Sequence, residues 1–231
     1  MGQLPLDRAW LWAASRDFAG YDPYDALRSP LFAALHRVLG RPFGIAATQL
    51  TRRAPVNVRP FLGITPTANA KGLGPFLSAA ARTRRRDETR VLADRLRVMQ
   101  APGWDVPCWG YPFPWQSRAF YLPANTPTVV ATSFVGEAFL DAFALLQDPR
   151  DLETALGACR FVLERLHRTE DATGTCLSYS PLDRSAIYNA SILGARLLVR
   201  VGLASGREDL IAQAEPLARF VLARQREDGS W

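Results

Sequence analysis

The stretch Cys159-Arg160-Phe161-Val162-Leu163-Glu164-Arg165 returns 59 residues later as Ala218-Arg219-Phe220-Val221-Leu222-Ala223-Arg224. Around the first copy, apolar side chains recur every three or four residues from Leu152 to Leu166, a spacing that predicts one buried stripe on a helix. A segment that recurs at a fixed interval is typical of a repeat architecture. The sequence therefore predicts that a helical unit repeats about every 58 residues.

A second helix precedes each copy, and it repeats as well. Ser133-Phe134-Val135-Gly136 matches Ser191-Ile192-Leu193-Gly194 at a shift of 58, and the segment 69–74 returns at 189–194, about two periods later. These first helices are rich in small residues and apolar on most sides, whereas the second helices have one apolar stripe and carry arginines. Helices of the first kind belong inside a fold and those of the second kind outside. The pattern predicts an all-α protein, an α/α toroid built as a ring of helical hairpins. The alternative is an open α-solenoid, whose repeats are shorter, at about 34 to 47 residues.

The chain is expected to form a single domain over residues 1–231. We expect helices at 6–18, 24–39, 43–53, 67–84, 87–100, 127–147, 150–168, 184–203 and 207–226. From residue 24 onward these segments supply four pairs of an inner and an outer helix, fewer than closed rings of this kind generally use. The sequence therefore favours an incomplete ring and a chain truncated at its C-terminal end, an N-terminal fragment.

Composition limits the partners. The chain is 48% hydrophobic and 22% charged, as in an ordinary globular protein, with a net charge of +6, and Lys71 is the sole lysine among 28 basic residues. The densest basic run, 82–86, is followed at once by Asp87 and Glu88, which indicates the end of one helix and the start of another. We therefore expect no nucleic-acid partner.

Three cysteines and two histidines lie far apart, without the close spacing of a zinc or redox site. We expect no metal and no cofactor, and sparse cysteines suit a reducing cytoplasm. The first residues lack the basic and apolar segments of a secretory signal. Glu137 and Asp141 interrupt the most apolar stretch, 127–146, so no membrane span is expected.

The end of the chain carries a recognisable turn. Gln225-Arg226-Glu227-Asp228-Gly229-Ser230-Trp231 resembles the Gln-x-x-x-Gly-x-Trp motif of the terpenoid cyclase and protein prenyltransferase toroids, and similar glycine-aromatic turns occur in six-hairpin glycosidase-like proteins. In such a turn the glutamine can bind free backbone groups at a helix end while the tryptophan covers them. The acidic motifs with which terpenoid cyclases protonate or bind their substrates do not occur in the chain.

A second resemblance covers most of residues 7–231. The segments 20–27 (Gly-Tyr-Asp-Pro-Tyr-Asp-Ala-Leu) and 110–118 (Gly-Tyr-Pro-Phe-Pro-Trp-Gln-Ser-Arg), with Asn125-Thr126-Pro127 following, are similar to a group of bacterial toroid proteins. Those proteins are associated with extracellular polysaccharide synthesis and carry glycosidase-like or lyase-like labels. The resemblance implies a carbohydrate context without a defined mechanism.

The segment 104–121 is the richest in aromatic residues. It contains seven where the chain average of 10% predicts about two: Trp104, Trp109, Tyr111, Phe113, Trp115, Phe120 and Tyr121. We expect an ordered loop over the mouth of the ring, acting either as a platform on which sugar rings stack or as a hydrophobic plug. Asp105, Gln116 and Arg118 are its polar members. Arg118 is expected either to clamp an acidic group of a glycan through its planar fork or to pair with a structural carboxylate.

Glu137 and Asp141 stand four residues apart and so share one face of an inner helix. The repeat does not require them, since the aligned positions hold Pro75 and Ala79. Paired carboxylates are the groups that glycoside hydrolysis uses, although they normally face each other across the scissile bond. The alternatives are a catalytic pair and ion pairs with neighbouring arginines.

A third group of candidates surrounds the start of a later inner helix and comprises Tyr179, Asp183, Arg184, Tyr188 and Asn189, at the same mouth as Asn125. A tyrosine base beside an arginine or asparagine would suit a lyase. Helix capping by Asp183 and buried hydrogen bonding by Asn189 are the simpler interpretation.

Three functions follow as hypotheses. The first is a carbohydrate-active or carbohydrate-binding toroid, glycosidase-like or lyase-like, with an oligosaccharide or polysaccharide as its partner. The second is a terpenoid-cyclase-like enzyme, and the third is a non-catalytic scaffold of a polysaccharide assembly system. An acidic and aromatic cleft would favour the first, a closed apolar cavity the second, and a mouth without converging polar groups the third.

Overall fold

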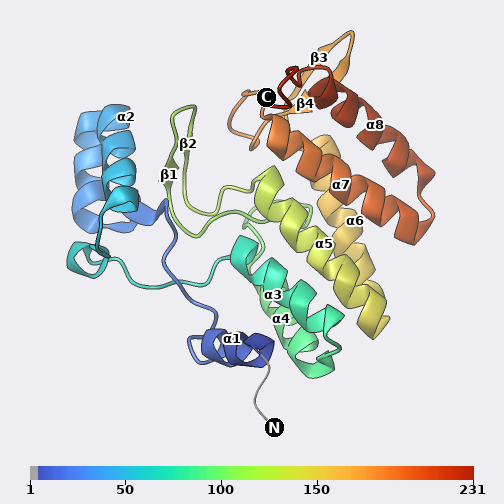
Figure 1. Cartoon of the computed structure of the whole chain (residues 1–231), viewed down its shortest axis with the longest axis horizontal. Coiled ribbons are helices and arrows are strands. Elements are labelled where there is room, and N and C mark those ends of the chain that lie inside the picture. Colours follow the sequence, from blue (N-terminus) through green and yellow to red (C-terminus); the bar gives the residue numbers. More distant parts are fainter. Residues whose placement is uncertain (1–4) are drawn as a thin grey trace.

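The computed structural model describes residues 5–231, and these residues are mostly helical (Figure 1). In chain order the helices are α1 (Pro5–Ala14), η1 (Asp25–Arg28), α2 (Pro30–Arg53), η2 (Pro60–Leu62), α3 (Ala70–Arg82), α4 (Arg86–Val98), α5 (Val129–Leu146), α6 (Pro149–Glu164), α7 (Tyr188–Ser205) and α8 (Glu208–Leu222). Two antiparallel hairpins complete the fold, β1 (Trp115–Gln116) with β2 (Tyr121–Leu122), and β3 (Arg168–Asp171) with β4 (Gly174–Leu177).

Three helical hairpins form the body of the molecule, α3 with α4, α5 with α6, and α7 with α8 (Figure 1). The inner helices α3, α5 and α7 pack side by side, and their first residues, Ala70, Val129 and Tyr188, lie 59 positions apart along the chain. The period read from the sequence is therefore the spacing of the hairpins, and the predicted repeat is confirmed.

Small residues let the inner helices approach one another. A Cβ atom added at Gly74 would lie 3.1 Å from the Phe134 carbonyl oxygen on α5, and one at Gly136 would lie 2.9 Å from the Leu197 Cδ1 on α7. The equivalent glycine on α7, Gly194, and Ala131 on α5 are both buried. The predicted orientation, with the small-residue faces turned inward, is confirmed.

Helix α5 lies at the centre of this body. Twelve of its 18 residues are buried, and it packs against α3, α6 and α7. Among the described residues it is the one helix long and apolar enough to cross a membrane by length and composition, and 67% of that window is buried inside the protein. A core helix passes the same test, and the burial of α5 fits that interpretation.

Helix α2 departs from the prediction. The segments 24–39 and 43–53 were expected to form the first inner and outer pair of the ring, but α2 packs on η1 and β1 instead, on the other side of the β1–β2 hairpin from α5 (Figure 1). Gly40, with φ of 66°, reverses the chain inside α2, so that Phe32 meets Phe43 with their ring centroids 5.7 Å apart. The two halves of α2 thus pack on each other and on η1 and β1, and three hairpins rather than four are stacked.

Tryptophans seal the ends of two outer helices. The Trp109 indole N–H donates to the Leu96 carbonyl in the last turn of α4 at 2.7 Å, and the Trp231 indole N–H donates to the Val221 carbonyl in the last turn of α8 at 3.0 Å. The side chain of Gln225 donates to the Gly229 carbonyl within the turn itself. In the predicted glycine-aromatic turn, the tryptophan therefore adds a second donor to a carbonyl of the last helical turn, which also accepts from the Arg224 N–H at 3.1 Å, and the glutamine holds the turn.

Candidate functional site

The inner helices begin at one end of the body, and their first turns define a mouth. The Asn69 side chain caps α3 by accepting from the Gly72 N–H at 2.6 Å, and the Thr128 hydroxyl caps α5 by accepting from the Ala131 N–H at 3.1 Å. Helix α7 begins after Ile187. Side chains from the first turns of all three helices therefore reach the same space.

This space is a cavity of about 460 Å³, which we call the mouth cavity. Two segments outside the inner helices also contribute to it, the loop before η1 and the aromatic segment 111–120. Its walls are formed by Asp22, Tyr24, Lys71, Tyr111, Phe113, Trp115, Ser117, Arg118, Ala119, Phe120, Val130, Tyr179, Ile187 and Asn189.

Aromatic rings form one wall of the mouth cavity. The Trp115 ring on β1 has centroids within 6.0 Å of four neighbours, namely Tyr24, Tyr111, Phe120 and Tyr179. Phe120 stacks on Tyr179 with centroids 5.0 Å apart. The β1–β2 hairpin thus folds the loop back so that rings distant in the sequence form one continuous surface.

Two tyrosine hydroxyls meet within this wall. The hydroxyl oxygens of Tyr111 and Tyr179 lie 3.3 Å apart. Burial raises the pKa of Tyr111 to about 12, and burial together with the neighbouring Tyr111 raises the pKa of Tyr179 further. Both hydroxyls are therefore neutral at ordinary pH, which makes them hydrogen-bond donors and disfavours Tyr179 as a base.

Asp22 supplies a carboxyl group to the mouth cavity. It accepts a hydrogen bond from the Tyr24 N–H at 2.9 Å, and the Asn69 amide lies 3.5 Å from its other oxygen. Burial raises the pKa of Asp22, and the nearby Asp25 raises it further, against the opposing effect of Lys71. A partly buried carboxyl whose pKa is raised is suited to hold or give up a proton near the substrate.

Two cationic side chains complete the mouth cavity. Lys71 stands in the first turn of α3 with its Nζ 5.6 Å from the centroid of the Phe134 ring on α5. Arg118 stands in the turn between β1 and β2, where its carbonyl accepts a hydrogen bond from Arg41 of α2. The cavity therefore combines an aromatic wall with one carboxyl and two positive charges.

The sequence predicted part of this site. The structure brings Tyr111, Trp115, Arg118, Tyr179 and Asn189 together at the mouth cavity. It also places three residues there that were not predicted as site residues, Asp22, Tyr24 and Lys71. Lys71 could have been found, because it directly follows Asn69-Ala70, the segment that aligns with Asn189-Ala190 at the start of a later inner helix.

Three residues of the aromatic segment lie elsewhere. Trp109 is completely buried against Phe139, so this part of the segment is the plug rather than the platform. Gln116 is buried, and its amide donates to the carbonyls of the β1–β2 turn. Asp105 pairs with Arg165 at 2.5 Å beyond the end of α6. The expectation that these three residues bind substrate at the mouth does not fit their positions.

The remaining predicted site residues lie in separate surroundings. Asp183 is buried and accepts hydrogen bonds from the Ser180 N–H at 2.7 Å and the Ser185 N–H at 3.0 Å, so it organises the turn rather than facing the cavity. Arg184 and Asn125 are exposed. Tyr188 packs on Phe220 of α8 with centroids 6.1 Å apart.

Glu137 and Asp141 lie one helical turn apart on α5, beyond Val130, the residue of α5 that lines the mouth cavity. Glu137 accepts hydrogen bonds from Arg196 and Arg200 of α7, each at 2.7 Å, and Asp141 accepts from Arg200 at 2.7 Å and from Arg82 of α3 at 3.1 Å. The structure therefore forms the ion pairs that were the alternative to a catalytic pair. Because both carboxylates bind the same guanidinium, they lie side by side and do not face each other across a gap.

No group of three or more histidine, cysteine or acidic side chains is arranged to hold a metal ion in residues 5–231. The three cysteines, Cys108, Cys159 and Cys176, are buried and free, and burial raises the pKa of each thiol.

Comparisons with known proteins give only distant likenesses. No protein-family model and no curated protein sequence matches the chain. A D-mannose isomerase structure superposes with a TM-score of 0.51 at 14% identity, covering 90% of this chain and 61% of the isomerase. A glycoside hydrolase family 76 mannosidase from Bacteroides thetaiotaomicron superposes with a TM-score of 0.48 at 13% identity, covering 67% of this chain and 43% of the mannosidase. The chain thus spans less than two thirds of the length of either protein. With its repeated inner and outer helices and its likeness to the isomerase, the chain has the all-α, α/α-toroid fold.

Proposed function

We propose that the chain is a carbohydrate-processing toroid that holds a sugar in the mouth cavity. The observation that carries this proposal is the aromatic wall around Trp115, which faces the same 460 Å³ space as Asp22, Lys71 and Arg118. The apolar faces of sugar rings stack on aromatic side chains, and their hydroxyls require hydrogen-bonding partners at the edge of the stack. The fold shared with a D-mannose isomerase supports the proposal.

The residues have distinct roles in this proposal. Trp115 and Phe120 stack against the sugar, and Lys71, Arg118 and Asn189 bind its hydroxyls or an acidic substituent. The neutral hydroxyl of Tyr179 donates a hydrogen bond. Asp22 moves the proton, because it is the carboxyl of the mouth cavity and its pKa is raised. Glycoside hydrolysis and lyase reactions both depend on such a proton transfer. A positioned acid or base contributes about 10²- to 10⁴-fold to the rate of reactions of this kind.

The other two hypotheses fit the mouth less well. A terpenoid-cyclase-like enzyme needs a closed apolar cavity, whereas charged side chains line this one. A non-catalytic scaffold has no need of converging polar groups. We further propose that the protein acts in the cytoplasm on an oligosaccharide or polysaccharide of bacterial polysaccharide metabolism, the context implied by the sequence resemblance.

The test is sugar binding to the wild type and to Trp115→Ala. The substitution removes the centre of the aromatic wall, so we expect the dissociation constant for neutral oligosaccharides to rise about tenfold or more. Trp12→Ala is the matched control, because Trp12 is an exposed tryptophan on α1. An oligosaccharide array followed by calorimetry on each hit measures the effect.

The binding results can contradict the proposal in two ways. Equal binding by the wild type and Trp115→Ala, or no binding by the wild type to any member of the array, would contradict it. Where a hit is found, product release by the wild type but not by Asp22→Asn would identify the protein as an enzyme that uses this carboxyl.

A further inference from the structure

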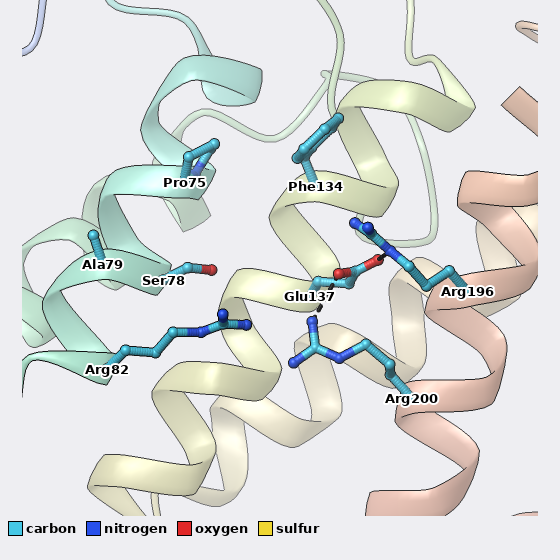
Figure 2. A pocket seen from close by; sticks show the side chains of 8 residues that line it. All are labelled: Pro75, Ser78, Ala79, Arg82, Phe134, Glu137, Arg196 and Arg200. Atoms are coloured by element: carbon cyan, nitrogen blue, oxygen red, sulfur yellow. Dashed lines mark hydrogen bonds and ion pairs between the residues drawn. The ribbon is translucent and has the colours of Figure 1, made fainter. Parts of the chain in front are cut away.

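A second cavity, of about 600 Å³, lies below the mouth between the inner helices (Figure 2). We call it the arginine cavity. It is lined by Pro75, Ser78, Ala79 and Arg82 of α3, Phe134 and Glu137 of α5, and Arg196 and Arg200 of α7. Figure 2 shows the guanidinium groups of Arg82, Arg196 and Arg200 pointing toward its centre from two facing helices.

The carboxylates of α5 hold these guanidinium groups but do not use all their donors. A guanidinium has five N–H donors. In the bonds found among residues 5–231, Arg196 donates through Nε alone, to Glu137, and Arg82 donates through Nε and Nη2, to Asp141. Both Nη groups of Arg196 and the Nη1 of Arg82 therefore remain available, and the side chain of Arg196 is 51% exposed.

The charge of the arginine cavity favours an anion. Three guanidinium groups meet two carboxylates, so the cluster has an excess of one positive charge. The planar fork of an arginine matches the oxygens of a carboxylate or phosphate, to which it can donate two parallel hydrogen bonds. By fixing Arg200 and the Nε of Arg196, Glu137 positions these forks before a ligand arrives.

The arginine cavity lies close to the mouth cavity along the helices. On α5, Val130 lines the mouth cavity and Glu137 the arginine cavity, and seven residues of helix separate them by about 10 Å. Lys71 of the mouth lies over the ring of Phe134, which lines the arginine cavity. One ligand of a few sugar units can therefore touch both.

We propose that Arg82, Arg196 and Arg200 bind the anionic group of an acidic sugar, a carboxylate or a phosphate, while the rest of the sugar stacks in the mouth cavity. The inference rests on the proposed function for the sugar, whereas the anion site itself can be tested without any sugar. In this view Glu137 and Asp141 are positioning residues for the arginines.

The first experiment uses inorganic phosphate alone. Thermal unfolding is followed with increasing phosphate at constant ionic strength for the wild type, Arg196→Gln, Arg196→Lys and Arg219→Gln. Arg219 is the matched control, because this exposed arginine of α8 pairs with Glu215 at 3.8 Å, outside the arginine cavity. We expect phosphate to raise the melting temperature of the wild type and of Arg219→Gln, to have no effect on Arg196→Gln, and to recover part of its effect with Arg196→Lys.

The phosphate response of Glu137→Gln distinguishes an anion site from an ion-pair network that only stabilises the fold. Glutamine keeps a side-chain oxygen that can accept from these arginines, so they stay positioned, while the loss of the negative charge raises the net positive charge and releases donors of Arg196 and Arg200. We therefore expect a larger phosphate response than in the wild type. The same phosphate response in the wild type, Arg196→Gln and Glu137→Gln would overturn the inference.

The second experiment compares sugars by calorimetry, namely a disaccharide with one uronic acid, the same disaccharide with that acid reduced to the alcohol, and a sugar phosphate. We expect whichever anionic form is the ligand to bind about tenfold more tightly than the neutral form, and Arg196→Gln to remove that preference without changing neutral binding. Neutral binding without any preference for the anionic sugars would overturn the inference and leave the proposed function standing. Phosphate binding that depends on Arg196, without binding of any sugar, would support the anion site and contradict the proposed function.

Discussion

At the scale of single residues, the mouth cavity depends on groups whose ionisation the fold has changed. Asp22 is one such group, because burial raises its pKa above the ordinary value of 3.8 while the hydrogen bond from the Tyr24 N–H and the charge of Lys71 oppose the rise only in part. The raised pKa means that the folded protein binds this proton more tightly than the unfolded chain does.

This difference predicts how stability varies with pH. As the pH rises from 3.8 through the raised pKa, the unfolded chain loses the proton first, so the free energy of unfolding should fall. In Asp22→Asn this contribution is absent. We therefore expect the stability of the wild type relative to Asp22→Asn to decline across this interval and then to level off. Urea unfolding at a series of pH values measures the difference, and a constant difference would show that the pKa of Asp22 is not raised.

The sequence predicted only some of these residues, for a physical reason. Trp115 and Tyr179 were predicted because an aromatic cluster and the start of a repeated helix can be read locally. Asp22 reaches the mouth only because the loop before η1 is held there by distant groups, with Arg59 donating to the Asp22 carbonyl at 2.9 Å. Such a contact has no local signature.

At the scale of elements, helix ends decide where the loops go. Trp109 and Trp231 make the same hydrogen bond to the last turn of an outer helix, but Trp109 is completely buried whereas Trp231 is 55% exposed. In α4 the Gln100 N–H donates to Arg97, so the Leu96 carbonyl depends on the indole of Trp109.

The pair makes a matched comparison. Trp109→Phe leaves a buried carbonyl without a partner and opens a small void, so we expect it to lower the free energy of unfolding by about 2–4 kcal/mol. At the exposed end the Val221 carbonyl keeps the Arg224 N–H as a donor and water can replace the indole, so Trp231→Phe should cost about 0.5 kcal/mol or less. Denaturant unfolding of both variants tests this, and equal losses would mean that neither burial nor the remaining donor sets the value of the bond.

Helix positions were predictable from the sequence, whereas the short strands were not. The helices carry periodic apolar residues and capping signals, and α3 to α8 agree with the predicted ranges to within two residues beyond either end. Helices α4 and α6 each begin one residue early, at Arg86 and Pro149, and α7 ends two residues late, at Ser205. The β3 strand, Arg168–Asp171, has four exposed side chains and so lacks the alternation by which a strand is recognised. It pairs with β4 across the tight turn at 172–173, where the Asp171 side chain accepts from the Thr173 N–H at 2.8 Å.

At the scale of the whole molecule, two parts differ in how deeply they are buried. Twelve of the 18 residues of α5 are buried, against four of the 24 in α2, namely Gly44, Ala47, Thr48 and Thr51. The sequence predicted two helices in the region of α2, but it did not predict that they would pack outside the array of hairpins, because the repeat pattern does not extend to them.

This contrast predicts unequal protection of the backbone. Amides of α5 should exchange with deuterium only when the whole protein unfolds, whereas those of α2 should exchange through a local opening of lower free energy. Hydrogen exchange measured by mass spectrometry across a denaturant series tests this. Equal protection of α2 and α5 would mean that the two parts unfold as one unit.

The composition of the chain gives the mouth cavity a further use. Lys71 is the sole lysine of the sequence and lines that cavity. A dye that reacts with amines can therefore attach to one side chain of this protein, beside the proposed sugar, and the α-amino group at the N-terminus is the other amine it can label. Its emission would report ligand entry directly, without any engineered cysteine.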